Sequence, residues 1–140
     1  MIADVREYAR SRLDVLGYDE WSDGFDFKDI PLTKLDESYH LELGSVRGVS
    51  NSQTSLVMEC PFTVRLFISP SGDPKSLIDQ GVDVADTVIA DLMKSSNRTL
   101  YSGLQNIGFV GMTIEPLDQN NDNGVIIRIE FNAMVTISTI

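Results

Sequence analysis

Apolar residues recur at helical spacing near the start of the chain. From Ile2 to Leu16 they stand three or four positions apart, and Gly17 follows where a helix commonly ends. We therefore expect a helix over residues 2–16 that packs one apolar face against the rest of the protein.

A second and longer helical pattern occupies the middle of the chain. Asp73 and Pro74 have the order typical of an N-cap followed by proline at the first helical position. The apolar positions that follow keep helical spacing: Leu77, Ile78, Val82, Ala85, Val88, Ile89, Leu92 and Met93. Gly81 falls on the same face, where it permits close approach to a sheet. The pattern predicts a helix over residues 74–95, with four aspartates on the side that faces solvent: Asp79, Asp83, Asp86 and Asp91.

Four other segments have the alternation of apolar and polar residues that is typical of strands. They cover residues 38–43, 56–68, 106–115 and 125–138. Pro61 interrupts the second of them and has no N–H to donate, so we expect an edge position or a bulge there. The last segment would span roughly 46 Å at about 3.3 Å per residue, which is longer than the core of a small domain needs. We expect it to project as a hairpin or to pair beyond its own subunit.

Two polar segments separate these strands. Residues 44–55 are rich in Gly, Ser and Asn with Arg47 as the only charge, and we expect a flexible loop. Between the last two strands, Asp118, Asn120 and Asp122 match the first, third and fifth ligands of an EF-hand calcium loop. Asn123 and Ile129 stand where that loop needs glycine and a bidentate glutamate. The pattern favours a hairpin turn closed by Asn123-Gly124, with a weakly held cation as the alternative.

The order of elements predicts the fold class. Adjacent strands and two separated helices in the order α-β-β-α-β-β favour an α+β fold. We expect a mostly antiparallel sheet with the helices packed on one face and a long projecting hairpin. The chain has 140 residues, which suits a single domain spanning residues 1–140.

Charge and composition narrow the classes of function. Eleven Lys and Arg against 21 Asp and Glu give a net charge of −10, which argues against a groove that grips phosphates. No apolar run approaches the roughly 18 residues of a membrane span, and the first residues lack the apolar core of a signal peptide. Seven acids lie within residues 19–37 among interleaved aromatic residues. This segment is either a loop that anchors its aromatics to the domain or an acidic surface that meets a basic partner.

The residues that could carry catalysis are few. His40 is the only histidine and Cys60 the only cysteine, a usage that suits a reducing compartment and leaves no cluster with metal-ligand spacing. A Cys60–His40 nucleophile pair is conceivable, but Cys60 lies on the apolar side of its strand, where a small buried hydrophobe is the better interpretation. Phosphate-binding and nucleophile-elbow motifs are absent. We expect no enzyme, no catalytic or metal-binding residues and no cofactor.

The layout of the chain resembles a known family of structural proteins. The resemblance lies in four stretches: Tyr-His-Leu-Glu-Leu at 39–43, Glu-Cys-Pro-Phe-Thr-Val-Arg-Leu-Phe at 59–67, Asn-Ile-Gly-Phe at 106–109 and Ile-Glu-Pro-Leu-Asp at 114–118. Together with the order of helices and strands, they resemble the tail terminator proteins of long-tailed bacteriophages, also called tail completion proteins. The resemblance covers nearly the whole chain and is one of layout and texture.

The resemblance implies a structural role in the neck of the virion. Such proteins form a ring, typically a hexamer, that caps the tail tube, ends its polymerisation and presents a surface to the connector of the head. The partners implied are further copies of the chain, the tail tube protein and a head-completion or connector protein, and DNA passes through without specific binding. The implied location is the virion neck, and the host cytoplasm during assembly, with no role for a membrane.

The polar segments 44–55 and 116–124 are candidate partner contacts that order on assembly. The residues concerned are Arg47, Asn51, Asp118, Asn120, Asn121 and Asp122. Within the same class, a head-closure or connector adaptor has the same sequence features. A small ligand-binding regulatory module is the alternative from another class, and it requires an apolar cleft between the helix at 74–95 and the sheet.

Overall fold

The computed structural model describes residues 2–21, 38–68, 74–116 and 124–138. Two helices lie against a six-stranded sheet in an α+β fold, as the sequence predicts. The elements follow one another as α1 (Ile2–Val15), β1 (Asp19–Glu20), β2 (Ser38–Leu43), β3 (Arg47–Asn51), β4 (Ser55–Ile68), α2 (Pro74–Met93), the short 3-10 helix η3 (Ser95–Arg98), β5 (Leu104–Pro116) and β6 (Val125–Ser138).

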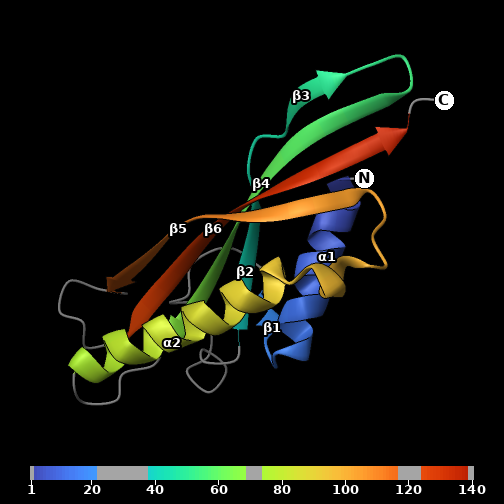
Figure 1. Cartoon of the computed structure of the whole chain (residues 1–140). Helices are drawn as coiled ribbons and strands as arrows, with labels where there is room; N and C mark the ends of the chain where they lie inside the picture. The colour runs from blue at the N-terminus through green and yellow to red at the C-terminus, as the bar shows by residue number, and fades with distance from the viewer. Residues whose placement is uncertain (1, 22–37, 69–73, 117–123, 139–140) are drawn as a thin grey trace.

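The sheet has the strand order β1-β2-β4-β6-β5, and β3 pairs with β4 on the same side as β2. Only the short β1–β2 pair is parallel, and every other pair is antiparallel. The long strands β4 and β6 pair along their whole length, from Ser55 opposite Ser138 to Ile68 opposite Val125. These two strands form the spine of the molecule (Figure 1).

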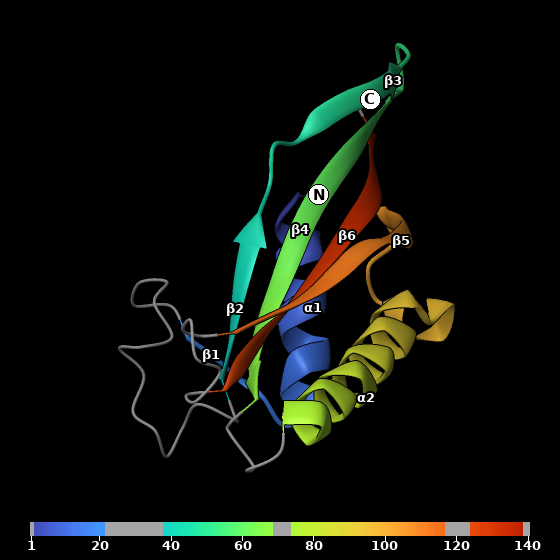
Figure 2. The ribbon, with the colours of Figure 1, turned by 90° about the vertical axis from the view of Figure 1, so that its left-hand side faces the viewer.

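The core lies between the sheet and the two helices, which cover the same face (Figure 2). Alternate side chains of β4 and β6 point into it, and at its centre the rings of Phe62 and Phe131 stack with centroids 5.2 Å apart. Gly81 of α2 faces the sheet, where a Cβ atom would lie 3.2 Å from Cδ1 of Ile114. The expected close approach of this helix is therefore confirmed.

The end of α1 is set by the glycine that the sequence pattern indicates. Gly17 has φ +95°, and its N–H donates to Asp14 while the N–H of Tyr18 donates to Leu13. These two bonds form a Schellman motif, which satisfies carbonyls at the end of the helix.

The segment expected as a flexible loop forms a strand instead. Residues 47–51 are β3, which pairs with the first part of β4 from Arg47 opposite Glu59 to Asn51 opposite Leu56. The hydroxyl of Ser52 accepts hydrogen bonds from the N–H groups of Thr54 and Ser55 in the turn between the two strands. All five residues of β3 are exposed. The prediction of a loop from the polar composition is therefore wrong. This strand covers no core, so its residues need not be apolar.

Pro61 lies in a central strand, so the expected edge position or bulge is wrong. It pairs with Asn132 of β6 on one side, and its carbonyl accepts the N–H of Gly44 at 2.7 Å on the other. On that second side β2 ends at Leu43, and β3 begins only at Arg47. The missing N–H of the proline thus faces the break between two strands, where the regular ladder stops.

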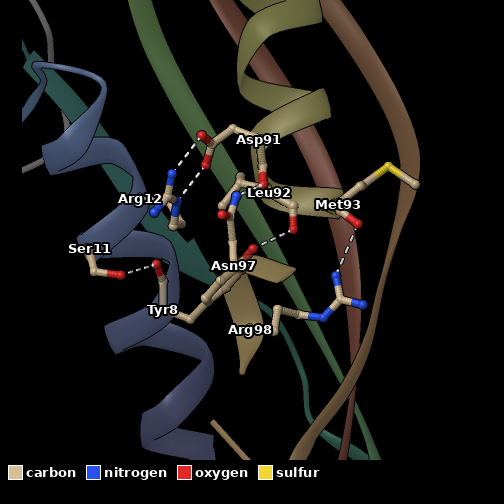
Figure 3. Close-up of polar contacts among 8 residues, drawn as sticks. All are labelled: Tyr8, Ser11, Arg12, Asp91, Leu92, Met93, Asn97 and Arg98. Atoms are coloured by element: carbon tan, nitrogen blue, oxygen red, sulfur yellow. Dashed lines mark hydrogen bonds and ion pairs between the residues drawn. The ribbon is translucent and has the colours of Figure 1, made fainter. Parts of the chain in front are cut away.

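Side chains from α1 and η3 hold the C-terminal end of α2 (Figure 3). The hydroxyl of Tyr8 donates to the carbonyl of Leu92 at 2.7 Å. Asn97 donates to the carbonyl of Asp91, and Arg98 donates to that of Met93. The last carbonyls of a helix have no partner within it, so these three side chains act as its cap. The helix ends at Met93, two residues before the expected end at residue 95.

One of the four aspartates predicted to face solvent on α2 is tied to α1 instead. Asp79, Asp83 and Asp86 are exposed, as expected. The side chain of Asp91 is only 16% exposed, and both of its oxygens accept hydrogen bonds from Arg12, at 2.7 and 2.8 Å. The pattern placed Asp91 off the apolar stripe correctly, but α1 covers that flank of the helix.

Candidate assembly surface

The strand β5 forms one edge of the sheet and carries no charge over most of its length. Residues 104–114 include no charged side chain, although the whole chain carries a net charge of −10. Val110 is 62% exposed and Phe109 is 44% exposed. Edge strands of soluble proteins are usually short or carry lysine, proline or bulges. Here the strand is long, its first charge is Glu115, and its protection consists of two bulges and a terminal Pro116.

An apolar stripe on α2 adjoins this edge. Ile78 is 51% exposed, Val82 39% and Met93 40%, although the sequence pattern assigned all three to the buried face. At about 100° per residue, they lie on one flank of the buried stripe, whereas Asp91, which binds Arg12 of α1, lies on the other. The stripe therefore faces away from α1, on the side where α2 contacts β5.

The opposite edge of the sheet ends in an arm that runs past the helices (Figure 1). We define the arm as β3 with the paired ends of β4 and β6, where Ser55, Leu56 and Val57 face the last residues of β6. The strand β5 reaches only as far as Val135, so the arm has no strand on that side. The expectation that the last strand projects is confirmed. Exposed valines lie on the arm or just before it: Val46 at 38% and Val49 at 50%.

The structure places two of the six candidate contact residues. Arg47 and Asn51 are the first and last residues of β3, so they lie on the arm rather than in a loop. The side chain of Arg47 is 74% exposed and contacts Glu59 at 2.6 Å. The other four candidates lie outside the described residues, as does the cation alternative with them: Asp118, Asn120, Asn121 and Asp122.

Gly124, which directly precedes β6, has the positive φ that the sequence suggests for it, while Asn123 and the rest of the expected turn lie outside the described residues. Its φ is +100°, and a Cβ atom there would lie 2.3 Å from the carbonyl oxygen of Ile68. Glycine is therefore required at this position for both backbone conformation and space.

Charges are distributed unequally over the two faces of the molecule. Three ion pairs lie on the face of the sheet opposite the helices: Arg47 with Glu59, Arg65 with Glu42 and Arg128 with Glu130. On α2, by contrast, Asp79, Asp83 and Asp86 are exposed and form no ion pair with any described residue. Three carboxylates without a described ion-pair partner thus lie on the helical side of the molecule, on α2.

A cavity of about 590 Å³ lies beside α1. Its lining comprises Glu7, Arg10, Ser11, Asp14, Tyr18, Asp19, Glu20, Tyr39 and Tyr101. Arg10 pairs with Glu20, and burial together with the Glu20 carboxylate raises the pKa of Tyr39 to about 12. A second cavity of about 290 Å³ lies on the open face of the sheet, lined by Glu42, Thr63 and Arg128 among others. Neither lies between α2 and the sheet, where Gly81 packs closely against Ile114.

The two residues considered as a nucleophile pair do not meet. Cys60 is fully buried in the core, and burial raises the pKa of its thiol. His40 of β2 lies opposite Arg65, which is five residues after Cys60 on β4, so His40 and Cys60 are on opposite faces of the sheet. The Nδ1 atom of His40 is 3.2 Å from the carbonyl oxygen of Trp21. The expected role of Cys60 as a buried hydrophobe is confirmed.

The described part of the chain offers neither a metal site nor a membrane-spanning helix. No three His, Cys, Asp or Glu residues within it gather in a way that could hold a metal ion. Its helices also fall short of the length and apolar character needed to cross a membrane.

The sequence pattern did not indicate the outer edge of β5 or the apolar stripe of α2. Their residues look like ordinary strand and helix positions, and which of them remain uncovered depends on the strand order. The one available signal was the uncharged run at 104–114 in a strongly acidic chain. The sequence matches no known family model, and no curated protein matches it at a significant level.

Proposed function

We propose that this chain is a structural subunit of the neck of a long-tailed bacteriophage, where it assembles into a ring that caps the tail tube. The ring ends tube polymerisation and provides the interface through which the head is joined. This proposal rests on the family resemblance of the sequence together with the surfaces described above.

The outer edge of β5, which pairs with no other described strand, is the observation that carries the proposal. A strand of 13 residues whose first 11 are uncharged presents backbone donors and acceptors to any strand that comes alongside. The exposed Phe109 and Val110 add apolar area to that edge. Pairing of such an edge with another chain is a common route to assembly, because main-chain hydrogen bonds supply affinity.

The charge of the surface suits a ring around DNA. The exposed carboxylates of α2 repel phosphates, and the described arginines on the open face of the sheet are paired with glutamates. A channel lined by such surfaces lets DNA pass without binding it. The proposed partners are other copies of the chain, in a hexamer, with the tail tube protein on one side and a head-completion or connector protein on the other.

Two alternatives share part of this support. A head-closure adaptor of the neck uses the same edges and the same charge. A small ligand-binding module is favoured instead by the cavity beside α1, where four carboxylates and three tyrosines surround Arg10. That lining suits a cationic ligand such as an organic amine.

Native mass spectrometry of the purified chain, with negative-stain images of the same sample, tests the proposal. A closed ring with six times the monomer mass is the expected result. A chain that stays monomeric at high micromolar concentration contradicts it. A melting temperature raised by spermidine in such a monomer would support the ligand-binding module.

A further inference from the structure

Among the described strands, β5 and β3 each pair on one side only, and their outer edges differ in the charges that surround them. The edge of β5 is flanked by the acidic residues Asp79, Asp83 and Asp86 of α2 and ends at Glu115. The opposite edge, on the arm, has a single charged residue between 44 and 55, which is Arg47. One edge is therefore apolar with an acidic border, and the other mixes polar and apolar residues and has one charge, Arg47, which is paired with Glu59.

We propose that the edge of β5 is the binding site for β3 of a second copy of this chain. This inference rests on the proposed ring and names the surfaces that form it. Val49 of the arriving β3 packs against Phe109 and Val110. The apolar stripe of Ile78 and Val82 is covered by the same contact.

Charge decides between this arrangement and pairing of two β5 edges. A two-fold contact brings identical surfaces together, so it would set the acidic borders of two α2 helices against each other. Like charges placed across an interface repel each other and disfavour the contact. Pairing of β5 with β3 avoids this repulsion, because the one charge of the arm between residues 44 and 55, Arg47, is paired with Glu59. Such a contact is head-to-tail, and it generates a ring when its rotation closes.

The arm has the position that this contact requires. It runs past the helices, so a neighbouring chain can approach its outer edge without meeting α1 or α2 (Figure 2). The free edges of β3 and β5 also lie on opposite sides of the β4–β6 spine. Each copy can therefore pair its β3 with β5 of one neighbour and its β5 with β3 of another.

Lysine substitutions at the two edges test the contact in the full chain. Val110→Lys and Val49→Lys each place a charge at an exposed position, so both variants should fold and keep the circular dichroism spectrum of the original protein. Each should raise the dissociation constant of the assembly roughly tenfold or more, because a charge is then buried in the contact without a partner. Thr87→Lys is the matched control, because Thr87 is exposed on the far side of α2. It should leave assembly unchanged.

Crosslinking distinguishes the partner surfaces. Val49→Cys and Thr113→Cys are made separately and treated with a short bis-maleimide, and Cys60 stays unreactive because it is fully buried. The proposal expects crosslinked dimers only when the two variants are mixed. Dimers from Thr113→Cys alone would overturn it in favour of β5–β5 pairing.

The outcomes separate the inference from the proposed function. A ring that tolerates both edge lysines and gives no mixed crosslink overturns the inference and leaves the ring itself in place. A monomeric wild-type chain overturns both. Loss of the ring in both edge variants, with Thr87→Lys intact and the mixed crosslink present, supports the β3–β5 contact.

Discussion

At the scale of single residues, Tyr8 carries more of the stability than its place on a short helix suggests. It is fully buried, and its hydroxyl donates to the carbonyl of Leu92 at the end of α2. Tyr8→Phe keeps the ring but leaves that carbonyl without its donor. We expect a loss of about 1–2 kcal/mol in the free energy of unfolding, measured by urea denaturation.

Tyr101→Phe is the matched control for this prediction. Its ring lies edge-on to that of Tyr8, with centroids 5.7 Å apart, so both substitutions change the same cluster. The hydroxyl of Tyr101 forms no hydrogen bond with a described residue, and its removal should cost less than about 0.5 kcal/mol. Equal losses in the two variants would contradict a specific role for the bond to Leu92.

Tyr39 makes the stability of the protein sensitive to alkaline pH. Burial, and then the Glu20 carboxylate, raise its pKa to about 12 from 10. The folded state thus holds the phenolic proton more tightly than the unfolded state does. The contribution of the protonated Tyr39 to the free energy of unfolding is complete below pH 10 and is lost as the pH rises towards 12. Between about pH 9 and 11 we expect a loss of about 1 kcal/mol that Tyr39→Phe does not show, measured by urea denaturation. Equal slopes in both proteins would exclude this role.

At the scale of elements, the approach of α2 to the sheet depends on Gly81. The Cβ of an alanine there would lie 3.2 Å from the flexible end of Ile114, and the helix would gain about 1 kcal/mol of propensity. Gly81→Ala should therefore be nearly neutral. Gly81→Leu should cost about 1–3 kcal/mol by overpacking, measured by thermal or urea unfolding. A neutral leucine would mean that α2 can shift away from β5 without penalty.

The elements differ in how far the sequence could predict them. Both helices and the four long strands were readable, because each must present a periodic apolar face to a common core. The strand β3 was not, because its five residues pack on no core and their polarity resembles that of a loop. The position of Pro61 in a central strand could not be predicted either. A proline is accepted there because the pairing of β4 passes from β2 to β3 at this point, and that break cannot be seen in the sequence.

The candidate site was predictable only in part. The arm was anticipated by the length of the last strand, and Arg47 by its isolation in a polar segment. The edge of β5 depends on strand order, which local periodicity does not specify. The exposure of Ile78, Val82 and Met93 depends on where α1 packs, since it covers one flank of α2 and leaves the other uncovered.

At the scale of the whole molecule, net charge opposes assembly while the edges favour it. Each chain carries −10, so neighbouring copies repel, yet the edge of β5 is uncharged from residue 104 to residue 114. Salt screens the repulsion, with a Debye length that falls from about 30 Å at 0.01 M to about 8 Å at 0.15 M. Backbone pairing and apolar contact are much less affected. We therefore expect the assembled fraction to rise with salt over this range, measured by sedimentation velocity.

Removing charges far from the proposed contact provides the control. Glu7 and Asp14 are exposed on α1, away from β5 and the stripe of α2. The double variant Glu7→Gln with Asp14→Asn lowers the repulsion without touching either edge. It should assemble more readily at low salt and depend less on added salt. If salt dissolved the assembly instead, ion pairs rather than strand pairing would hold the copies together, because screening weakens attraction between opposite charges as it weakens repulsion.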